Sequence, residues 1–450
     1  MALTAQSFIS TVTKPAFPLA VRGEGAYIFD KDGKKYLDGS SGAVVTALGH
    51  SHPRVLAAMR AQLEKITFAY GRIWENRPDE ELAVRVAALC GGSFDSAFFL
   101  SSGSEATEAA LKFARQLAVA RGQSERYKVI SRTPSYHGAT LGALSVTGDP
   151  VMVDLFGPLM TPMPKIPAPM IYRVPAGYSA DAYIDHCADA LEEEIKQQGA
   201  ETVLAFVVEP VGGTSTGALV SPGRYYLRVR EICDRYGVLL IHDEVMSGVG
   251  RCGAFLASHY WPGAAPDVVT LGKGLGAGYA PISALVTSSA LVDEVRAMGG
   301  FAHGHTYVAN PMSCAVGCAV LEELVDSALV EQSASMGLYL REQLEVVRNR
   351  RRSIGDIRGV GLQMAIEIVA DQATKESYPF EVNAPAQIER LMMERGLTMM
   401  HRRTGGGQFG EWFMVCPPLI STRDAVDQLI SILDGALEAF EGQSGQRACS

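Results

Sequence analysis

The chain has 450 residues, enough for one large and one smaller domain, and 47% of them are hydrophobic, which excludes a disordered chain. Its 40 basic and 49 acidic side chains give a formal net charge of −9, which argues against a nucleic-acid or anionic-membrane surface. Eight cysteines without a CxxC pair indicate a reduced, cytoplasmic protein and no readable metal site. Residues 1–13 have no basic stretch and no long apolar core, so we expect no secretory signal.

Short strands and turns are predicted for the N-terminal part. We expect a hairpin with strands at Ala26–Phe29 and Lys35–Leu37 around a turn at Asp30–Gly33. From about His52 to Gly299, short apolar runs alternate with helical patterns, which is typical of βαβ units and a mostly parallel sheet. The runs lack polar alternation, so helices should cover both faces of the sheet. They are Ala97–Leu100, Val129–Ile130, Val203–Val208, Val238–Ile241 and Val268–Leu271.

Seven of the 22 prolines lie between Pro150 and Pro175. Proline lacks the backbone N–H and clashes with the preceding turn of a helix, so we expect no helix in this segment. We interpret it either as a loop beside a site or as a plain connector.

Beyond Gly300, long helical patterns alternate with strands such as Gly361–Glu367, which predicts a smaller α+β domain. Apolar residues at three- and four-residue steps over Val426–Phe440 predict a final helix, with Ser421 and Asp424 placed as a capping box. We therefore divide the chain into residues 1–51, which contribute to the small domain, a large domain at 52–320 and a C-terminal small domain at 321–450.

In open parallel sheets, ligands bind at the carboxyl ends of the strands, so the residues after each apolar run are the candidates for a site. After the first run comes Ser101–Ala106, which opens a strong helical pattern at Ala106–Arg115. Hydroxyl-bearing residues and glycine at a helix start expose backbone N–H groups, which bind phosphate with the help of the helix dipole. An ordinary helix N-cap explains the same segment equally well.

Polar residues also follow the next three runs. Tyr136, His137 and Gly138 come after the second run, and such a tyrosine could stack on a planar ligand, although packing explains a Tyr-His pair more often. Glu209 and Asp243 end the following two runs, and a carboxylate buried at a strand end needs a cation or a hydrogen-bond donor. The alternative for Asp243 is a helix N-cap in the following loop.

Lys273, flanked by Gly272 and Gly274, ends the last run. Desolvation at such a place lowers the pKa of a lysine and frees its amine for Schiff-base chemistry. A phosphate cradle, an aromatic stacker, a buried carboxylate and this lysine together suit pyridoxal phosphate, whose phosphate, ring face, ring nitrogen and aldehyde need those four partners. Gly274–Gly278 fits neither GxGxxG nor a P-loop, which argues against a dinucleotide or nucleotide site.

Five ordered segments resemble the class III (ω-) aminotransferase family of fold-type I pyridoxal phosphate enzymes, and the similarity extends over almost the whole chain. The segments are Ser102–Ala106, Tyr136–Gly138, Asp243–Val245 with Gly250–Arg251, Leu271–Gly274, and His305–Tyr307 with Asn310–Pro311. The resemblance implies an α/β fold like that of aspartate aminotransferase, in which helices sandwich a mostly parallel sheet and a smaller α+β domain is attached.

By this resemblance Lys273 would carry the Schiff base and move the proton, and Asp243 would keep the pyridine nitrogen protonated. Tyr136 would stack on one face of the ring and Val245 on the other. The other cofactor contacts that the resemblance implies are Ser102, Gly103, Ser104, His137, Glu209, which often pairs with a mobile arginine, and Thr306, which would reach the phosphate of the neighbouring subunit. The site would therefore need a homodimer with shared active sites, which could assemble further into a dimer of dimers.

Met414, four residues before Pro418, stands where relatives that use glutamate and 2-oxoglutarate generally have an arginine for the α-carboxylate. Loss of that clamp should penalise glutamate and favour pyruvate as the acceptor. Pyruvate-using relatives employ a movable arginine nearby, for which Arg402 and Arg403 are the candidates, although both also suit a solvated loop. Cys252 replaces a threonine that is common in the family, a change that we expect to be tolerated.

The function that the resemblance implies is transfer of an amino group from a primary amine or ω-amino acid to a keto acid, with pyruvate as the expected acceptor. Tyr70 and Trp74 would be walls of the substrate pocket, although core packing explains Trp74 equally well. The cofactor residues alone do not choose the reaction, so a phospho-lyase, an aminomutase or a racemase stays open. A non-catalytic, ligand-binding relative is a third possibility, against which the intact Lys273 argues.

Overall fold

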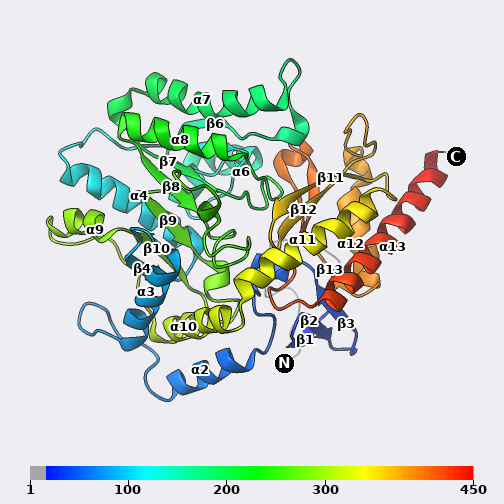
Figure 1. Cartoon of the computed structure of the whole chain (residues 1–450), viewed down its shortest axis with the longest axis horizontal. Coiled ribbons are helices and arrows are strands. Elements are labelled where there is room, and N and C mark those ends of the chain that lie inside the picture. The colour runs from blue at the N-terminus through cyan, green and yellow to red at the C-terminus, as the bar shows by residue number, and fades with distance from the viewer. Residues whose placement is uncertain (1–16, 449–450) are drawn as a thin grey trace.

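The computed structural model describes residues 17–448, and its largest sheet has seven strands (Figure 1). Their order is β4-β10-β9-β8-β7-β5-β6; the strands from β6 to β9 pair in parallel, and β10 is antiparallel to both of its neighbours. They are β4 (Ser96–Leu100), β5 (Lys128–Thr133), β6 (Lys165–Pro167), β7 (Val203–Val208), β8 (Leu239–Asp243), β9 (Val268–Leu271) and β10 (Ser283–Thr287). All five predicted runs form strands of this sheet, which confirms the α/β class. The expectation that residues 1–13 contain no secretory signal concerns residues outside the described range.

Helices cover both faces of this sheet. They are α4 (Gly103–Ala120), α7 (Ala180–Gln198), α8 (Gly223–Tyr236) and α9 (Ser289–Arg296). Phe206 and Val208 of β7 pack with α7 and α8, whereas Val207 packs with α4 and α9 on the other face. Every residue of β7 is therefore buried, as its uninterrupted apolar sequence predicts. None of the helices in residues 17–448 is long and apolar enough to cross a membrane.

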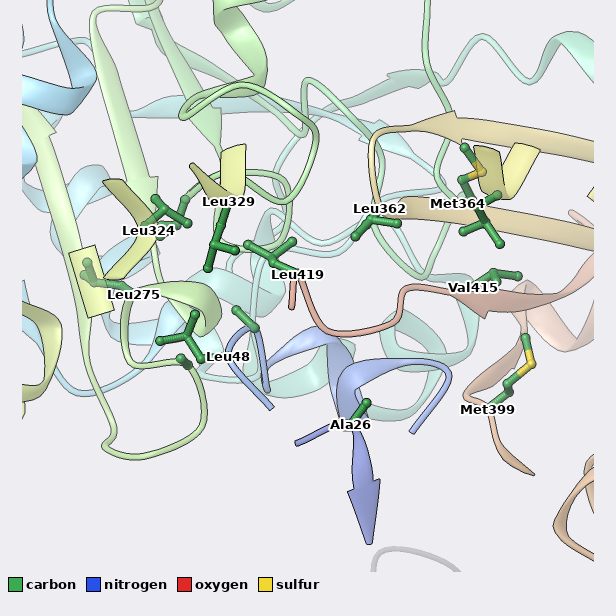
Figure 2. Packing of buried hydrophobic residues seen from close by; sticks show 14 of the residues in the cluster. Ala26, Leu48, Leu275, Leu324, Leu329, Leu362, Met364, Met399, Val415 and Leu419 are labelled. Atoms are coloured by element: carbon green, nitrogen blue, oxygen red, sulfur yellow. The ribbon is translucent and has the colours of Figure 1, made fainter. Parts of the chain in front are cut away.

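A second group of helices packs against both the large sheet and the two smaller sheets. They are α1 (Ser41–Val44), α2 (Pro53–Leu63), α3 (Arg77–Cys90), α10 (Pro311–Asp326) and α11 (Leu329–Arg348). Leu48, Leu275, Leu324, Leu329 and Leu419, from distant parts of the sequence, belong to one buried cluster there (Figure 2). Leu275 lies two residues after Lys273, so this apolar contact fixes the turn that follows β9.

Two four-stranded sheets, β1-β2-β3-β13 and β11-β12-β15-β14, complete the fold. The predicted hairpin is confirmed as β2 paired with β3, and β3 also pairs in parallel with β13, where Leu37 lies opposite Leu397. The N-terminal strands thus share a sheet with the C-terminal part; the domain boundaries after residues 51 and 320 stay a prediction. The remaining elements are β1 (Ala20–Glu24), β2 (Tyr27–Asp30), β3 (Lys35–Asp38), β11 (Ile354–Val360), β12 (Gln363–Ile368), β13 (Leu397–Thr398), β14 (His401–Arg403), β15 (Glu411–Val415), α5 (Leu141–Ser145), α12 (Ala384–Glu394) and α13 (Arg423–Ala448).

The expectation that the proline-rich segment contains no helix is wrong, because Pro150–Phe156 forms helix α6. Asp149 caps this helix, since its Oδ1 accepts a hydrogen bond from the Val151 N–H at 3.1 Å. Pro150 occupies the first helical turn, where the N–H that proline lacks has no intrahelical partner and the fixed φ of proline suits a helix. The later prolines of the segment lie outside α-helices, as expected.

The cap of α13 also differs from the predicted one. The Ala425 N–H donates to Thr422 Oγ1 at 3.3 Å, whereas the Ser421 hydroxyl is buried without a hydrogen-bond partner among the described residues. The helix begins at Arg423, so Thr422 occupies the capping position and Ser421 lies one residue too early.

Candidate active site

A cavity of about 440 Å³ lies at the carboxyl ends of the central strands. Because β7, β8 and β9 are neighbours in the sheet, Glu209, Asp243 and Lys273 meet at one edge of it. The start of α4 supplies Gly103 and Ser104 to the same cavity. The other lining residues are Ala43, Tyr136, His137, Gly138, Met152, Val211, Gly213, Thr214, Val245, Met246, Met400 and Arg402.

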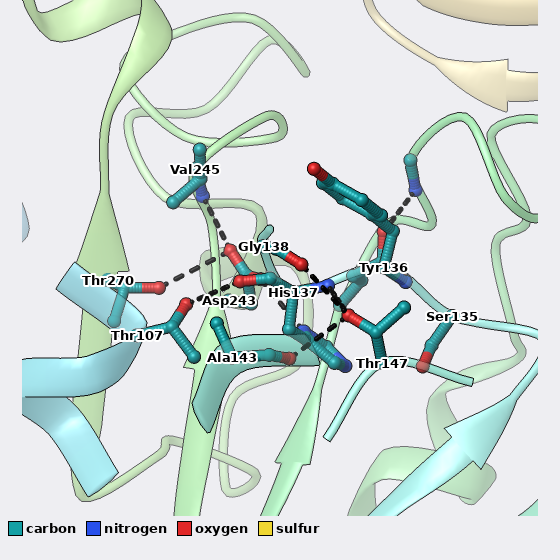
Figure 3. A network of polar contacts seen from close by, with 12 residues as sticks. Thr107, Ser135, Tyr136, His137, Gly138, Ala143, Thr147, Asp243, Val245 and Thr270 are labelled. Carbon is teal, nitrogen blue, oxygen red and sulfur yellow. Dashed lines mark hydrogen bonds and ion pairs between the residues drawn. The ribbon is translucent and has the colours of Figure 1, made fainter. Parts of the chain in front are cut away.

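The Asp243 carboxylate is buried and held by three groups (Figure 3). His137 Nδ1 lies 2.8 Å from Oδ2, and Oδ1 accepts hydrogen bonds from the Val245 N–H at 3.1 Å and the Thr270 hydroxyl at 3.3 Å. The backbone of His137 is itself fixed, because its N–H donates to Thr147 Oγ1 at 2.9 Å. Asp243 therefore presents a preorganised negative charge to the cavity, and not the N-cap that we considered as the alternative.

Lys273 follows β9 in a left-handed backbone conformation, with φ +39°. A residue other than glycine adopts this region at a cost, and such strain gathers at functional sites. Burial lowers the pKa of the Lys273 amine, although the negative charges of Asp243 and Glu209 oppose this shift. Among residues 17–448 no hydrogen bond engages Nζ, so a reactive amine faces the cavity.

The Glu209 carboxylate accepts hydrogen bonds from backbone N–H groups around the site. Its Oε1 accepts a hydrogen bond from the Gly213 N–H at 2.8 Å, and Oε2 accepts one from the Tyr136 N–H at 3.3 Å. Burial raises the pKa of the Glu209 carboxyl, while the nearby charges of His137 and Arg132 lower it. In this arrangement Glu209 positions Tyr136 and forms no salt bridge with an arginine among the described residues.

The start of α4 forms a tight cradle. The hydroxyl of Ser102 is used as the N-cap, because it accepts a hydrogen bond from the Glu105 N–H at 3.2 Å, which leaves Gly103 and Ser104 to face the cavity. The first N–H groups of a helix have no intrahelical acceptor and attract anions. A Cβ on Gly103 would lie 2.7 Å from Val245 Cγ1, so only glycine lets the backbone approach this closely.

Tyr136 and Val245 lie on opposite sides of Asp243 (Figure 3). Tyr136 is 41% exposed, so one face of its ring stays open to a ligand. Burial of its other side raises the pKa of the phenol, which therefore stays protonated at neutral pH. A flat ligand above Asp243 would lie between these two side chains.

Of the two candidate arginines, only Arg402 lines the cavity. Its guanidinium pairs with Asp149. Arg403 pairs with Glu411 and lies 4.4 Å from the centre of the Phe380 ring. Both arginines belong to β14, and successive side chains of a strand point to opposite faces, so one of the two turns away from the cavity.

Five predicted site residues do not line this cavity in the chain that the structure describes: Ser102 and Arg403, described above, and Trp74, Tyr70 and Thr306. Trp74 is 66% exposed and borders a different cavity of about 760 Å³ between α2, α3 and α10. Tyr70 and Thr306 are also exposed, on neighbouring loops where Phe68 packs against Tyr307. The predicted roles of Tyr70 and Trp74 as pocket walls, and of Thr306 as a contact to a neighbouring subunit, stay predictions.

Arg251, from one of the family-like segments, has a structural position. It is buried and donates hydrogen bonds to the Pro417 carbonyl at 2.6 Å and to Ser41 Oγ at 3.3 Å. It thereby ties the loop after β8 to both the N-terminal and the C-terminal parts. The neighbouring Cys252 is buried and donates to Gln363 Oε1 at 3.8 Å, so a thiol fits this loop.

Sequence reasoning missed the apolar part of the lining. Met152, Met246 and Met400 reach the cavity from three separate segments. Methionine occurs both in pocket walls and in hydrophobic cores, so the sequence alone could not identify these three residues as part of the lining. Asp149 was missed as well, although an aspartate directly before a proline is a recognisable helix start.

The cavity offers the four partners that pyridoxal phosphate needs, so the fold and the site define a pyridoxal phosphate-dependent enzyme. The family model for class III aminotransferases matches residues 9–437, and the chain belongs to this family. The enzyme is thus a transaminase, whose substrates are small amines and keto acids, and the predicted family, fold, cofactor and enzyme class are confirmed.

Individual relatives agree with this assignment. The chain is 38% identical over 429 residues to the uncharacterized aminotransferase YodT of Bacillus subtilis, covering 95% of this chain and 96% of that protein. An (S)-enantioselective ω-transaminase of Thermomicrobium roseum has a similar structure, with a TM-score of 0.87, 34% identity and coverage of 94% and 92% of the two chains. An ω-transaminase of Pseudomonas jessenii in complex with PMP gives a TM-score of 0.89 at 31% identity and covers 95% of this chain and 94% of that one.

Proposed function

We propose that this transaminase moves an amino group from a primary amine or ω-amino acid to pyruvate. The observation that carries the proposal is the composition of the cavity wall: Arg402 is the only guanidinium among its lining residues. One guanidinium suits an acceptor with one carboxylate, which pyruvate has, whereas 2-oxoglutarate has two. Met414, at the position where relatives that use glutamate and 2-oxoglutarate generally have an arginine for the α-carboxylate, is fully buried among Met246, Trp412 and Cys416.

Lys273 and Asp243 are proposed to perform the chemistry. When bound, pyridoxal phosphate carries the amino group between the two substrates and withdraws electrons from the reacting carbon. Lys273 Nζ would hold the cofactor covalently and move the proton at that carbon, for which its lowered pKa suits it. Asp243, fixed by His137, would hold the pyridine nitrogen in its protonated form.

Other residues of the cavity would position the cofactor. The N–H groups of Gly103 and Ser104 would bind the phosphate at the start of α4. Tyr136 and Val245 would pack on the two faces of the ring. Ser102 supports this cradle as a helix cap, and Glu209 supports it by holding the Tyr136 backbone.

A kinetic comparison of acceptors tests the proposed substrate. With one amine donor, we expect kcat/KM for pyruvate to exceed that for 2-oxoglutarate by about tenfold to a hundredfold, because the second carboxylate lacks a charged partner. Omitting the keto acid is the control, since a lyase would then still release ammonia and a racemase or aminomutase would still convert an amino acid. A preference for 2-oxoglutarate would contradict the assignment.

A homodimer with shared active sites is also part of the proposal. Ile66, Phe68, Ile73 and Trp74 expose apolar surface on the loop between α2 and α3, near the loop that carries Thr306. Such a patch suits burial against a second copy of the chain, which would bring Thr306 to the partner's cavity. The expected solution mass is therefore at least twice the 48.2 kDa of one chain, as light scattering would measure it.

We place the enzyme in the cytoplasm. The seven described cysteines are all buried free thiols, and burial raises the pKa of several of them, among which are Cys187 and Cys416. Protonated, inaccessible thiols suit a reducing compartment.

A further inference from the structure

The ion pair between Arg402 and Asp149 joins the cavity wall to helix α6. Arg402 comes from β14 and lines the cavity, whereas Asp149 is completely buried. The Arg402 side chain is 31% exposed, and its charged partner is this internal carboxylate. Its Nε–H is buried and has no hydrogen-bond partner among the described residues, so the guanidinium retains donors beyond those that Asp149 uses.

Asp149 has little freedom to move. Its Oδ1 caps α6 through the Val151 N–H, and its backbone carbonyl accepts a hydrogen bond from the Val153 N–H at 3.0 Å. The preceding residue, Gly148, lies so close to the Arg132 carbonyl oxygen that an added Cβ would be 1.9 Å from it. The backbone that carries Asp149 is therefore packed in place, and the carboxylate cannot follow a moving arginine.

The position of Arg402 is fixed by the same pair. If the guanidinium swung out of the cavity, it would leave the Asp149 carboxylate buried without a cation, which is unfavourable. The cavity therefore keeps a positive charge at this wall whichever substrate is present. A donor without a carboxylate would displace water from the Arg402 guanidinium without forming a hydrogen bond to it, which is unfavourable.

We propose that Asp149 is a specificity-determining positioning residue, which anchors Arg402 at the cavity wall and restricts the donors to amines that carry a carboxylate. The inference rests on the proposed function and narrows it from primary amines in general to amino acids. Met152, next on α6 along the cavity wall, would contact the carbon chain of such a donor.

The test compares 4-aminobutyrate with butan-1-amine, which has a methyl group in place of the carboxylate, at saturating pyruvate in the cofactor-loaded enzyme. We expect the wild type to favour 4-aminobutyrate by about a hundredfold in kcat/KM. Asp149→Asn keeps a side chain that can cap α6 but removes the charge that holds Arg402. It should lower kcat/KM for 4-aminobutyrate about tenfold or more and leave kcat/KM for butan-1-amine unchanged or improved. The donor's kcat/KM is the quantity compared, because it does not depend on the keto acid, whose carboxylate Arg402 is also proposed to bind.

The matched control is Asp154→Asn, which removes an exposed carboxylate from the same helix and should leave both donors unaffected. If Asp149→Asn does not fold, Asp149→Ser retains a smaller capping side chain and takes its place. Equal use of both donors by the wild type, or an unchanged donor ratio in the Asp149 variant, would overturn the inference while transamination itself persists. Absence of turnover with every donor and both keto acids would instead overturn the proposed function, and the inference with it.

Discussion

Lys273→Ala is expected to lower kcat by about 10⁴-fold or more, because one amine supplies both the covalent bond to the cofactor and the proton transfer. No other described residue that lines the cavity carries a primary amine, so no neighbour can substitute for it. The remaining partners of the cofactor are untouched by the change, and the variant should still bind pyridoxal phosphate without the covalent bond.

Lys165→Ala is the matched control for this loss. Burial also lowers the pKa of Lys165, to about 8, but its Nζ donates hydrogen bonds to the carbonyls of Ser145 at 2.7 Å and Met163 at 3.1 Å and does not line the cavity. Its replacement should leave kcat per folded molecule within a few-fold of the wild type.

Mass spectrometry after borohydride reduction distinguishes a cofactor that is covalently attached to the protein from one that is only bound. The wild type and the Lys165 variant should retain the added cofactor mass, whereas Lys273→Ala should not. Attachment of the cofactor to the Lys273 variant, or turnover above a few per cent, would show that a different amine does the chemistry.

The charged residues of the site were predictable because of where they stand in the sequence. Glu209, Asp243 and Lys273 end runs that are otherwise wholly apolar, and a charge at such a place is costly unless a ligand or partner meets it. Since β7, β8 and β9 are adjacent, prediction of the parallel sheet was enough to bring these three residues to one edge.

The partners that the charged residues find were harder to predict. His137 and Asp243 are 106 positions apart, and only the three-dimensional path of the chain brings them to 2.8 Å. The sequence does not distinguish Arg402 from its neighbour Arg403 as the arginine of the site. The pleat of β14 places them on opposite faces of the strand, and only Arg402 faces the cavity.

Helix α6 shows how a general rule can mislead at one position. The proline content of its segment argued against any helix, but Pro150 stands in the first turn, where proline is favoured. Because that helix was missed, its cap Asp149 and the pair with Arg402 were missed as well. Tyr70 and Thr306 lie on exposed loops outside the cavity, so their predicted roles rest on the resemblance alone.

Asp243→Asn is expected to lower kcat by about 10³-fold, less than Lys273→Ala. Asparagine has the same shape and can accept the hydrogen bonds from the Val245 N–H and Thr270, so the cavity should keep its geometry. The loss would come from the charge, because a neutral amide no longer favours the protonated pyridine nitrogen.

Asp30→Asn provides the control, since Asp30 is also buried and accepts a hydrogen bond from the Tyr36 hydroxyl at 3.0 Å but lies in the N-terminal hairpin. A cofactor analogue with a methylated ring nitrogen is positively charged at every pH. It distinguishes a role of Asp243 in keeping that nitrogen charged from a role in holding the geometry of the site. If Asp243 acts by keeping that nitrogen charged, the analogue should restore part of the activity of Asp243→Asn and none of the activity of Lys273→Ala. Equal activity of Asp243→Asn with both forms of the cofactor would mean that the carboxylate orients His137 and does not act on the ring.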